Sequence, residues 1–208
     1  MNLIFDLDNT IYSSERGVLE AINQNINRFM VEYAGIERSE VDLLRQKYRQ
    51  EYGVTLRGLI LHYGISPEDY LEFVHNIDYS RLISKDESLF NILNKLPNKK
   101  FVFTNSSRKH AENILSHLGI KEFFSKIISI EDTKYTPKPK PLSFKIMLEQ
   151  LDVEPEKSFF FDDMPENIET AKKLKFKTVL IGKSEHFPKA DYTIKDIYEI
   201  QNIEEIIQ

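Results

Sequence analysis

The sequence predicts an α/β fold: a mostly parallel sheet covered by helices on both faces, with an all-helical region inserted after the first strand. Two observations predict it. From about residue 99 onward, strand patterns alternate with helix patterns, and this alternation implies right-handed crossovers between parallel strands. Between residues 13 and 83, by contrast, helical patterns follow one another without a convincing strand.

The first expected elements are one strand and a run of helices. Asn2–Phe5 is a compact apolar run that ends at polar turn residues, as in a buried strand. A helix is indicated after the possible caps Ser13 and Ser14, and Gly35 can close it. Its apolar residues recur one, three and four positions apart, which predicts one buried face: Val18, Leu19, Ile22, Ile26, Phe29, Met30 and Tyr33.

Three more helices are expected before residue 83. One runs from about Ser39 to Tyr52, and another covers the segment TLRGLILHYG. The third begins at Ser66, because a capping serine followed by Pro67 and two acids is typical of a helix N-terminus.

The remaining chain alternates between the two kinds of element. Strands are expected in KKFVFTN, SKIISI, KSFFFDD and KTVLIG, and helices in SRKHAENILSHLG, PLSFKIMLEQL and PENIETAKKL. If the first strand joins this sheet, residues 1–12 and 84–208 form the α/β core, and residues 13–83 form the helical insertion.

Composition limits the functions to consider. The 208 residues are 41% hydrophobic and 29% charged, as in an ordinary globular protein, and the formal net charge is −5. No basic block indicates nucleic-acid binding, and no apolar run approaches the ~18 residues of a membrane span. The absence of cysteine excludes disulfides and thiolate chemistry. We expect a cytoplasmic monomer or homodimer that binds neither a nucleic-acid polymer nor a membrane.

Polar residues follow several of the expected strands. In open parallel sheets, ligands bind beyond the carboxyl ends of the strands, so these residues are candidates for the site. They are Asp6 and Asp8 after the first strand, Thr104 and Asn105 after the next, Lys134, Lys138 and Lys140 after SKIISI, and Asp162 and Asp163 after KSFFF.

Each of these motifs alone has a structural explanation. DLDNT is equally compatible with a turn and helix cap, Thr104 with strand propensity, and DDMPEN with a helix N-terminus. Their convergence at one edge favours function, because clustered carboxylates repel unless a cation lies among them. Carboxylate oxygens suit Mg²⁺, and Thr104 with a lysine suits a phosphoryl group. All histidines except His75 are interpreted as surface or packing residues.

Together the motifs resemble those of the haloacid dehalogenase-like hydrolases. The pattern is Asp-x-Asp-x-Thr in Asp6, Asp8 and Thr10, a strand-end Thr104, Lys138 in a Lys-Pro loop, and finally Asp162 and Asp163. Within the family, segments such as FDLDNTIY, FTNSSRKHAENILSHLGI and FFFDDMPENIETAKKL are similar to the pyrimidine 5′-nucleotidase-like branch. The resemblance implies a Rossmann-like core and a helical cap, residues 13–83, that closes over the site and excludes water.

The resemblance also implies catalytic roles. Asp6 would attack phosphorus and form an aspartyl phosphate, while Asp8 would protonate the leaving oxygen and then activate water. Thr10 would hold the turn at the phosphate site. Thr104, Lys138 and the backbone N–H of Asn105 would bind the phosphoryl oxygens.

A Mg²⁺ cofactor is also implied. Its ligands would be Asp6, Asp163 and the backbone carbonyl of Asp8, and Asp162 would act through water or support the ligands. Asn167 stands where many relatives have an acid, so its contact with the metal is left open. The choice of Lys138 over Lys140 rests on the KPxP context.

The substrate expected from the resemblance is a small phosphorylated metabolite, a pyrimidine nucleoside 5′-monophosphate in the first place. A sugar-phosphate or phosphoglycolate phosphatase and a phosphomutase of the same superfamily are the alternatives. Within the cap, Tyr52, Thr55, Arg57 and His75 are candidates for contacts to the leaving group, although helix surface or cap packing explains each of them too.

Functions of other classes fit less well. A phosphoacceptor signalling domain also uses paired acids, a Thr and a Lys, but its phosphoacceptor follows the third strand and its first strand has no helical insertion. A dinucleotide-binding domain or a P-loop NTPase would show its glycine-rich motif, and this sequence has neither.

Overall fold

The structure, a computed structural model, describes residues 1–183 and 185–207. Six strands form one sheet in the order β3-β2-β1-β4-β5-β6, and each neighbouring pair is parallel. The strands are β1 (Asn2–Phe5), β2 (Lys99–Phe103), β3 (Phe124–Ile128), β4 (Ser158–Asp162), β5 (Lys177–Ile181) and β6 (Tyr192–Ile194). Because β1 lies between β2 and β4, the residues that follow it are flanked by two other strand ends. The predicted fold class is confirmed.

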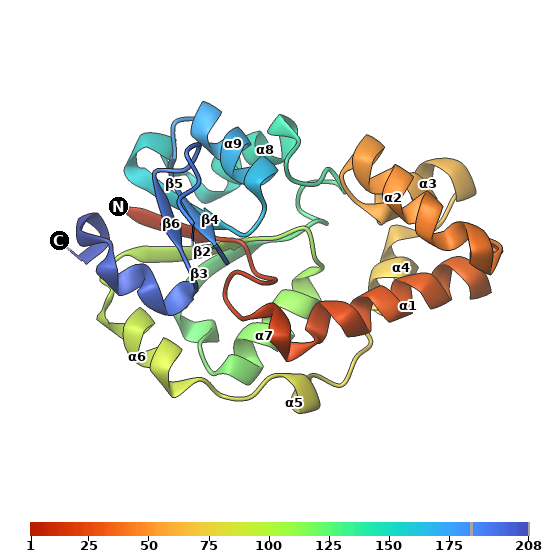
Figure 1. The fold of residues 1–208 in the computed structure, drawn as a ribbon, viewed down its shortest axis with the longest axis horizontal. Coiled ribbons are helices and arrows are strands. Elements are labelled where there is room, and N and C mark those ends of the chain that lie inside the picture. Colours follow the sequence, from red (N-terminus) through yellow and green to blue (C-terminus); the bar gives the residue numbers. More distant parts are fainter. Residues whose placement is uncertain (184, 208) are drawn as a thin grey trace.

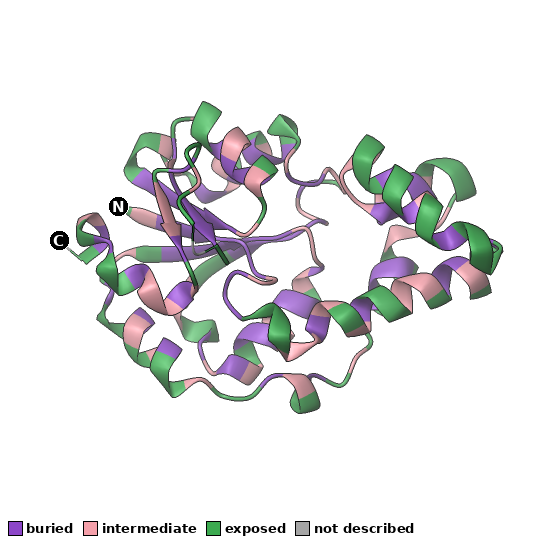
Figure 2. Cartoon of the chain, in the orientation of Figure 1, coloured by how far each residue is buried: buried purple, intermediate pink, exposed green. Residues whose placement is uncertain are grey.

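Helices cover both faces of the sheet (Figure 1). One face packs on α8 (Pro141–Leu151) and α9 (Pro165–Lys173), and the other on α6 (Glu87–Lys95) and α7 (Arg108–Leu118). The central strand β1 shows why two cores form: its side chains alternate, so Ile4 belongs to the first cluster and Leu3 and Phe5 to the second. Figure 2 shows the buried residues concentrated on the strands and on the inner faces of the helices.

Residues 13–83 contain helices and turns but no strand. The helices are α1 (Val18–Glu32), α2 (Val41–Tyr52), α3 (Thr55–Tyr63), α4 (Pro67–Val74) and the short α5 (Tyr79–Leu82), with 3₁₀ turns at Ser14–Arg16 and Arg38–Glu40. In Figure 1, α1 to α4 extend away from the sheet as a group. We keep residues 13–83 as the proposed cap and residues 1–12 and 84–208 as the proposed core.

The helix starts in the cap follow local chemistry. The Ser66 hydroxyl accepts a hydrogen bond from the Asp69 N–H at 3.2 Å, and Pro67 is the first residue of α4, as expected. The start of α1 differs from expectation. Ser13 caps the 3₁₀ turn instead, and Gly17, whose φ of 75° lies in the left-handed region, separates this turn from α1.

The chain ends in elements that we did not predict. They are β6, a 3₁₀ segment at Ile197–Asn202 and the short α10 (Glu204–Ile207); further 3₁₀ turns lie at Lys121–Phe123 and Pro155–Lys157. Strand β6 has three residues, too few for an alternating pattern to be recognised, and pairing with the edge of β5 defines it. In the described part of the chain, no helix has the length and apolar character to cross a membrane.

Candidate active site

The centre of the candidate site is the loop that leaves β1. The Asp6 N–H donates to the Phe161 carbonyl at 2.8 Å, so the ladder between β1 and β4 continues to the first acid. The Leu7 carbonyl then accepts from the N–H groups of Thr10 and Ile11, which closes a turn. Asn9 takes the left-handed conformation in this turn, with φ of 60°. The ladder and the turn thereby set the positions of Asp6 and Asp8.

Lys138 connects two buried carboxylates. Its Nζ lies 2.7 Å from Asp6 Oδ1 and 2.7 Å from Asp162 Oδ2, and the residue is only 2% exposed. Burial lowers the pKa of Lys138, but the negative charges of Asp162 and Asp6 outweigh it, so the net shift of this pKa is upward. Lys138 therefore stays a cation. Lys140, the alternative, is exposed.

Three acids at this edge offer a place for a cation. Asp6, Asp162 and Asp163 each have a carboxylate oxygen within 4.8 Å of the others. Burial raises the pKa of Asp6 well above its usual value; the charges of Asp162, Asp163 and Asp8 add to this rise, and Lys138 opposes it. Burial also raises the pKa of Asp163 to about 6, and the charge of Asp162 adds to this rise. Lys138 alone does not neutralise the cluster.

The chemistry of these oxygens fits Mg²⁺, which favours one or two carboxylates completed by water and phosphate oxygens. Asp162 has both oxygens engaged: Oδ2 by Lys138, and Oδ1 by Met164 N–H at 2.9 Å and Asn167 Nδ2 at 2.8 Å. Asp6 and Asp163 make fewer hydrogen bonds to protein groups than Asp162 does, so their oxygens would hold the metal and Asp162 would support them. Asn167 contacts Asp162 and so acts on the cluster indirectly.

Asp8 belongs to a different network. Its Oδ1 accepts from Tyr12 Oη at 2.5 Å and lies 2.8 Å from His110 Nε2, while its Oδ2 accepts from Ser106 Oγ at 2.6 Å. Burial alone would raise the pKa of Asp8. The charge and hydrogen bond of His110, assisted by Ser106 and Tyr12, outweigh burial and hold this pKa well below its usual value.

His110 corrects our interpretation of the histidines. It is fully buried, and its Nδ1 lies 2.9 Å from Tyr79 Oη. Since the Tyr79 hydroxyl donates its hydrogen to the His75 carbonyl at 3.0 Å, its oxygen accepts from Nδ1–H. The remaining proton of the ring is then shared between Nε2 and Asp8. The signal in the sequence was position: His110 lies in the first turn of α7, directly after the strand-end residues Thr104 and Asn105.

The other predicted phosphate ligands lie at the same edge. Thr104 is buried, and its Oγ1 accepts from the Ser106 N–H at 2.9 Å. The side chain of Asn105 accepts from the Lys138 N–H at 2.8 Å and donates to the Lys138 carbonyl at 3.1 Å. Asn105 thereby fixes the loop that carries Lys138, a contact that its predicted backbone role did not include.

A cavity of about 300 Å³ joins this edge to the cap. It is lined on one side by Asp6, Asp8, Thr104, Asn105, Lys138 and Asp163, and on the other by residues of α1, α2, α4 and the start of α3. Thr55 and His75, two of the cap candidates, line it. His75 also stacks on His110 with ring centroids 4.6 Å apart, and burial lowers its pKa to about 3, with the charge of His110 adding to the shift.

Two of the cap candidates need correction, because they do not line this cavity. The Tyr52 hydroxyl forms a hydrogen bond of 2.9 Å with His62 Nε2 on α3 instead. Arg57 follows Thr55 by two residues, and residues two apart in a helix lie on nearly opposite sides. Sequence reasoning missed Arg45 and Arg49, which do line the cavity.

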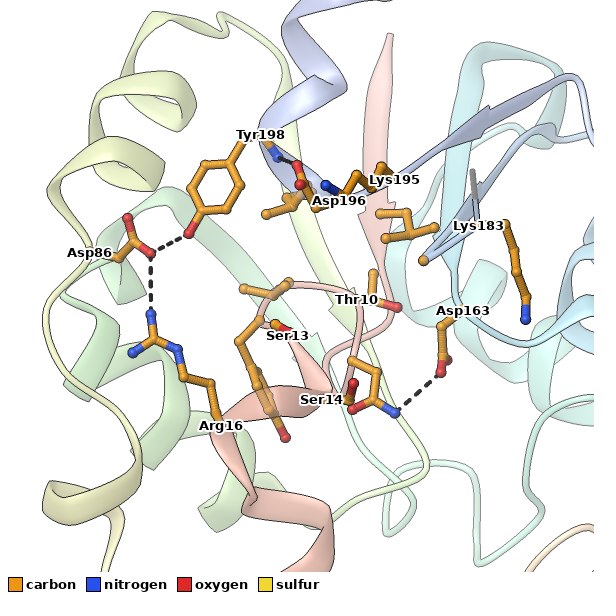
Figure 3. Close-up of a pocket in the computed structure, with 16 residues that line it drawn as sticks. Thr10, Ser13, Ser14, Arg16, Asp86, Asp163, Lys183, Lys195, Asp196 and Tyr198 are labelled. Atoms are coloured by element: carbon orange, nitrogen blue, oxygen red, sulfur yellow. Dashed lines mark hydrogen bonds and ion pairs between the residues drawn. The ribbon is translucent and has the colours of Figure 1, made fainter. Parts of the chain in front are cut away.

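Thr10 also needs correction. It lines a second cavity, of about 240 Å³ (Figure 3). Asp163 and Asn9 line both cavities, and Asn9 Nδ2 donates to Asp163 Oδ2 at 3.4 Å. Thr10 Oγ1 is buried and has no hydrogen-bond partner among the described residues. Its backbone closes the predicted turn, but its side chain lies away from the cavity that holds Lys138.

The chain is similar to known proteins. Residues 3–181 match the family described as "Haloacid dehalogenase-like hydrolase". The chain is similar to "Phosphate metabolism protein 8" of Saccharomyces cerevisiae, 27% identical over 97% of this chain and 72% of that protein. It is also similar to "Fructose-1-phosphate phosphatase YqaB" of Escherichia coli, 22% identical over 82% of this chain and 90% of that protein.

Among solved structures, the fold is similar to that of a phosphatase from Thermococcus onnurineus. The TM-score is 0.67 and the sequence identity is 20%, over 99% of this chain and 98% of the other. At this identity the likeness shows the fold alone. The family match, in contrast, covers most of the chain, from Leu3 in β1 to the end of β5, so this protein belongs to the haloacid dehalogenase-like hydrolase family.

Proposed function

We propose that this protein is a magnesium-dependent phosphatase that hydrolyses a small phosphate monoester through an aspartyl-phosphate intermediate. One observation carries the proposal. Asp6 and Asp8, two residues apart, lie in separate networks: Asp6 with Lys138 beside Asp162 and Asp163, and Asp8 with His110, Tyr12 and Ser106. Separate environments of this kind let two carboxyl groups take different roles. A cation bound at Asp6 and Asp163 would favour the ionised form of Asp6 that a nucleophile requires, against the upward shift of its pKa. The phosphatase named among the relatives supports the same class of reaction.

In the first step, an oxygen of Asp6 attacks phosphorus. Lys138 holds Oδ1, which leaves the second oxygen for the attack. As the new oxygen–phosphorus bond forms, the bond to the leaving oxygen breaks, and that oxygen takes a proton from Asp8. Lys138 then offers its charge to the phosphoryl oxygens, whose negative charge must be stabilised during transfer.

In the second step, water attacks the phosphorus of the aspartyl phosphate. Asp8 takes the proton from this water, the bond between Asp6 and phosphorus breaks, and inorganic phosphate leaves. General acid–base catalysis of this kind contributes typically about 10²–10⁴-fold in rate. Asp8 returns to its first protonation state, so the cycle balances.

The proton that Asp8 donates needs a source, because the pKa of Asp8 lies well below its usual value. His110 supplies one. Its Nε2 and Asp8 Oδ1 share a single proton across 2.8 Å, and Tyr79 keeps the other ring nitrogen protonated. The pair can therefore deliver a proton to the leaving oxygen and recover it from water. His110 acts through Asp8 and is a positioning residue.

The metal would be held by Asp6 and Asp163, with the Asp8 backbone carbonyl as the third protein ligand that the family resemblance implies. Bound there, Mg²⁺ would neutralise charge on the phosphoryl group. Asp162 and Asn167 hold Lys138 and the strand end in place around it.

For the substrate, we propose a pyrimidine nucleoside 5′-monophosphate first, because several segments resemble that branch of the family; a sugar phosphate, phosphoglycolate and a phosphomutase reaction are the alternatives. The lining of the cavity is compatible with a nucleoside, since Tyr70, Leu71 and Val74 offer an apolar wall and Asn23 a polar group. A cavity of about 300 Å³ limits the substrate to a small metabolite.

The test is a hydrolysis screen with Mg²⁺, using p-nitrophenyl phosphate as the general substrate and UMP, CMP, dUMP, AMP, sugar phosphates and phosphoglycolate as candidates. We expect turnover of p-nitrophenyl phosphate that falls by more than about 10³-fold in Asp6→Asn, since a nucleophile is lost. The exposed Asp78→Asn on the cap is the matched control. Near wild-type turnover in Asp6→Asn with an intact fold would reject the mechanism.

A further inference from the structure

The cap side of the cavity carries two positive charges that no part of the proposed mechanism uses. Arg45 and Arg49 lie one helical turn apart on α2, and both line the cavity that contains Asp6 and Lys138. Arg45 is only 7% exposed, although arginine is seldom buried unless it is paired. The surroundings of these two side chains indicate what the cavity binds.

The partners of Arg45 are all neutral. Its Nη1 donates to Asn27 Oδ1 at 2.6 Å and to the Asn23 carbonyl at 3.3 Å, and its Nη2 donates to Asn23 Oδ1. Among residues 1–183 and 185–207, no carboxylate lies within 4.0 Å of this guanidinium, and its Nε is buried without a partner. These contacts orient the charge but do not neutralise it, and a buried charge without a counter-ion is costly.

Arg49 adds to the imbalance. Burial lowers the pKa of Arg45 most strongly and the positive charge of Arg49 adds to this, while Tyr70 and the more distant Asp42 oppose the shift without reversing it. Like charges four residues apart also weaken a helix. In the described part of the chain, Arg49 has no ion pair of its own. Arg45 and Arg49 therefore make the cap side of the cavity positively charged, and neither side chain has a carboxylate to pair with in the described part of the chain.

The other residues on the cap side of the cavity cannot supply a negative charge. They are mostly apolar and include no carboxylate; the polar ones are Asn23, Thr55, Tyr70 and His75. Interactions between charges are stronger in such surroundings than in water, so an anionic group that enters the cavity gains most from the buried Arg45 and less from Arg49, which is exposed. The guanidinium group suits carboxylates and phosphates in particular.

We infer that the leaving group of the substrate carries a second negatively charged group, a carboxylate or a phosphate, that binds at Arg45 and Arg49 while the scissile phosphate lies at Asp6 and Lys138. The inference rests on the proposed phosphatase function and names a feature of its substrate. Simple nucleoside monophosphates such as UMP and simple sugar monophosphates lack such a group, so the inference favours a nucleotide with a carboxylated base, a sugar bisphosphate or a phosphorylated acid over them.

Three matched pairs of substrates test it, each differing in one anionic group. They are orotidine 5′-monophosphate and UMP, 3-phosphoglycerate and glycerol 3-phosphate, and glucose 1,6-bisphosphate and glucose 1-phosphate. The first two pairs test a carboxylate and the third a phosphate. For the pair that the wild-type enzyme hydrolyses best, we expect kcat/KM for the anionic member to be about 10- to 100-fold higher, mainly through a lower KM, because hydrogen bonds to charged groups are strong.

Variants assign this preference to the arginines. Arg49→Gln, at an exposed position that should not affect folding, should lower the ratio of kcat/KM within a pair by about tenfold, and Arg45→Gln by at least as much. Arg45→Lys, which keeps the charge, should retain most of the preference and guards against loss of the fold. The control is Arg28→Gln, an exposed arginine on α1 that pairs with Glu32.

The outcomes separate the two proposals. If the wild-type enzyme hydrolyses p-nitrophenyl phosphate but favours the neutral member in all pairs, or neither member, the second anionic group is wrong and the phosphatase stands. An unchanged ratio in both Arg45→Gln and Arg49→Gln would also overturn the role of the arginines. If no phosphate monoester is hydrolysed in the presence of Mg²⁺, the proposed function itself fails.

Discussion

The two sides of the cavity differ in how their charges are paired. On the sheet side, Lys138 lies between Asp6 and Asp162, and Asp8 has three partners, Tyr12, Ser106 and His110. On the cap side, Arg45 has only neutral partners. The sheet side is therefore organised before the substrate binds, while the charge of the cap side is balanced only by a ligand.

This difference follows from what each side does. Groups that stabilise a transition state act best when they are already oriented, because no energy is then spent on rearranging them during the reaction. Groups that select a substrate gain specificity when the substrate itself satisfies them, because any other molecule leaves a charge unpaired.

Removal of the metal should have the largest effect. Without Mg²⁺, the carboxylates Asp6, Asp162 and Asp163 face only Lys138, so we expect activity to vanish with a chelator and to return when Mg²⁺ is added. Mg²⁺ alone should also raise the Tm of the protein, because a ligand that binds only the folded state stabilises it. This rise should be lost in Asp163→Asn. Full activity in the chelator would contradict the metal site.

Lys138→Met should break the pairing of the sheet side. It leaves Asp6 and Asp162 buried without their shared cation, and removal of one partner from a buried pair costs about 3–5 kcal/mol. We expect a loss of that size in the free energy of unfolding, measured by urea denaturation, together with a large fall in kcat. Lys140→Met, two residues away and exposed, is the control and should change stability by less than about 0.5 kcal/mol.

His110→Asn should weaken the supply of protons to Asp8. For an alkyl phosphate, whose alkoxide must be protonated as it leaves, we expect kcat to fall by about 10- to 100-fold. For p-nitrophenyl phosphate the fall should be much smaller, because p-nitrophenolate leaves without a proton. Equal losses with both substrates would show that His110 has only a structural role.

The smallest effect concerns His75, which lies where the cap meets the sheet side. Its pKa in the folded protein is about 3, below the usual value of about 6.5, so between these values the unfolded chain binds more protons. Stability from the neutral ring is thus complete above pH ~6.5 and is lost as the pH falls toward 3. We expect His75→Gln to lose less stability than the wild type between pH 7 and pH 5, measured by urea denaturation at each pH. Identical pH dependence of the two proteins would contradict a half-buried, neutral His75.

Much of the fold could be predicted because its signals are local. Runs of apolar residues such as SFFFD in β4, and the cap at Ser66, report their own structure through burial and hydrogen bonds within a few residues. Strand β6 could not be recognised, since three residues give no pattern and pairing with β5 defines it.

The sequence alone predicts that Asp6, Lys138, Asp162 and Asp163 lie at one edge, because parallel strands end on the same side of a sheet. The tertiary structure decided which side chains meet there. It placed Lys138 rather than Lys140 between two carboxylates, His110 on Asp8, and the side chain of Thr10 in the neighbouring cavity. Periodicity tells which face of an element is buried, but contacts between residues about a hundred positions apart depend on how the elements pack, and the cap side of the cavity, Arg45 included, depends on this packing entirely.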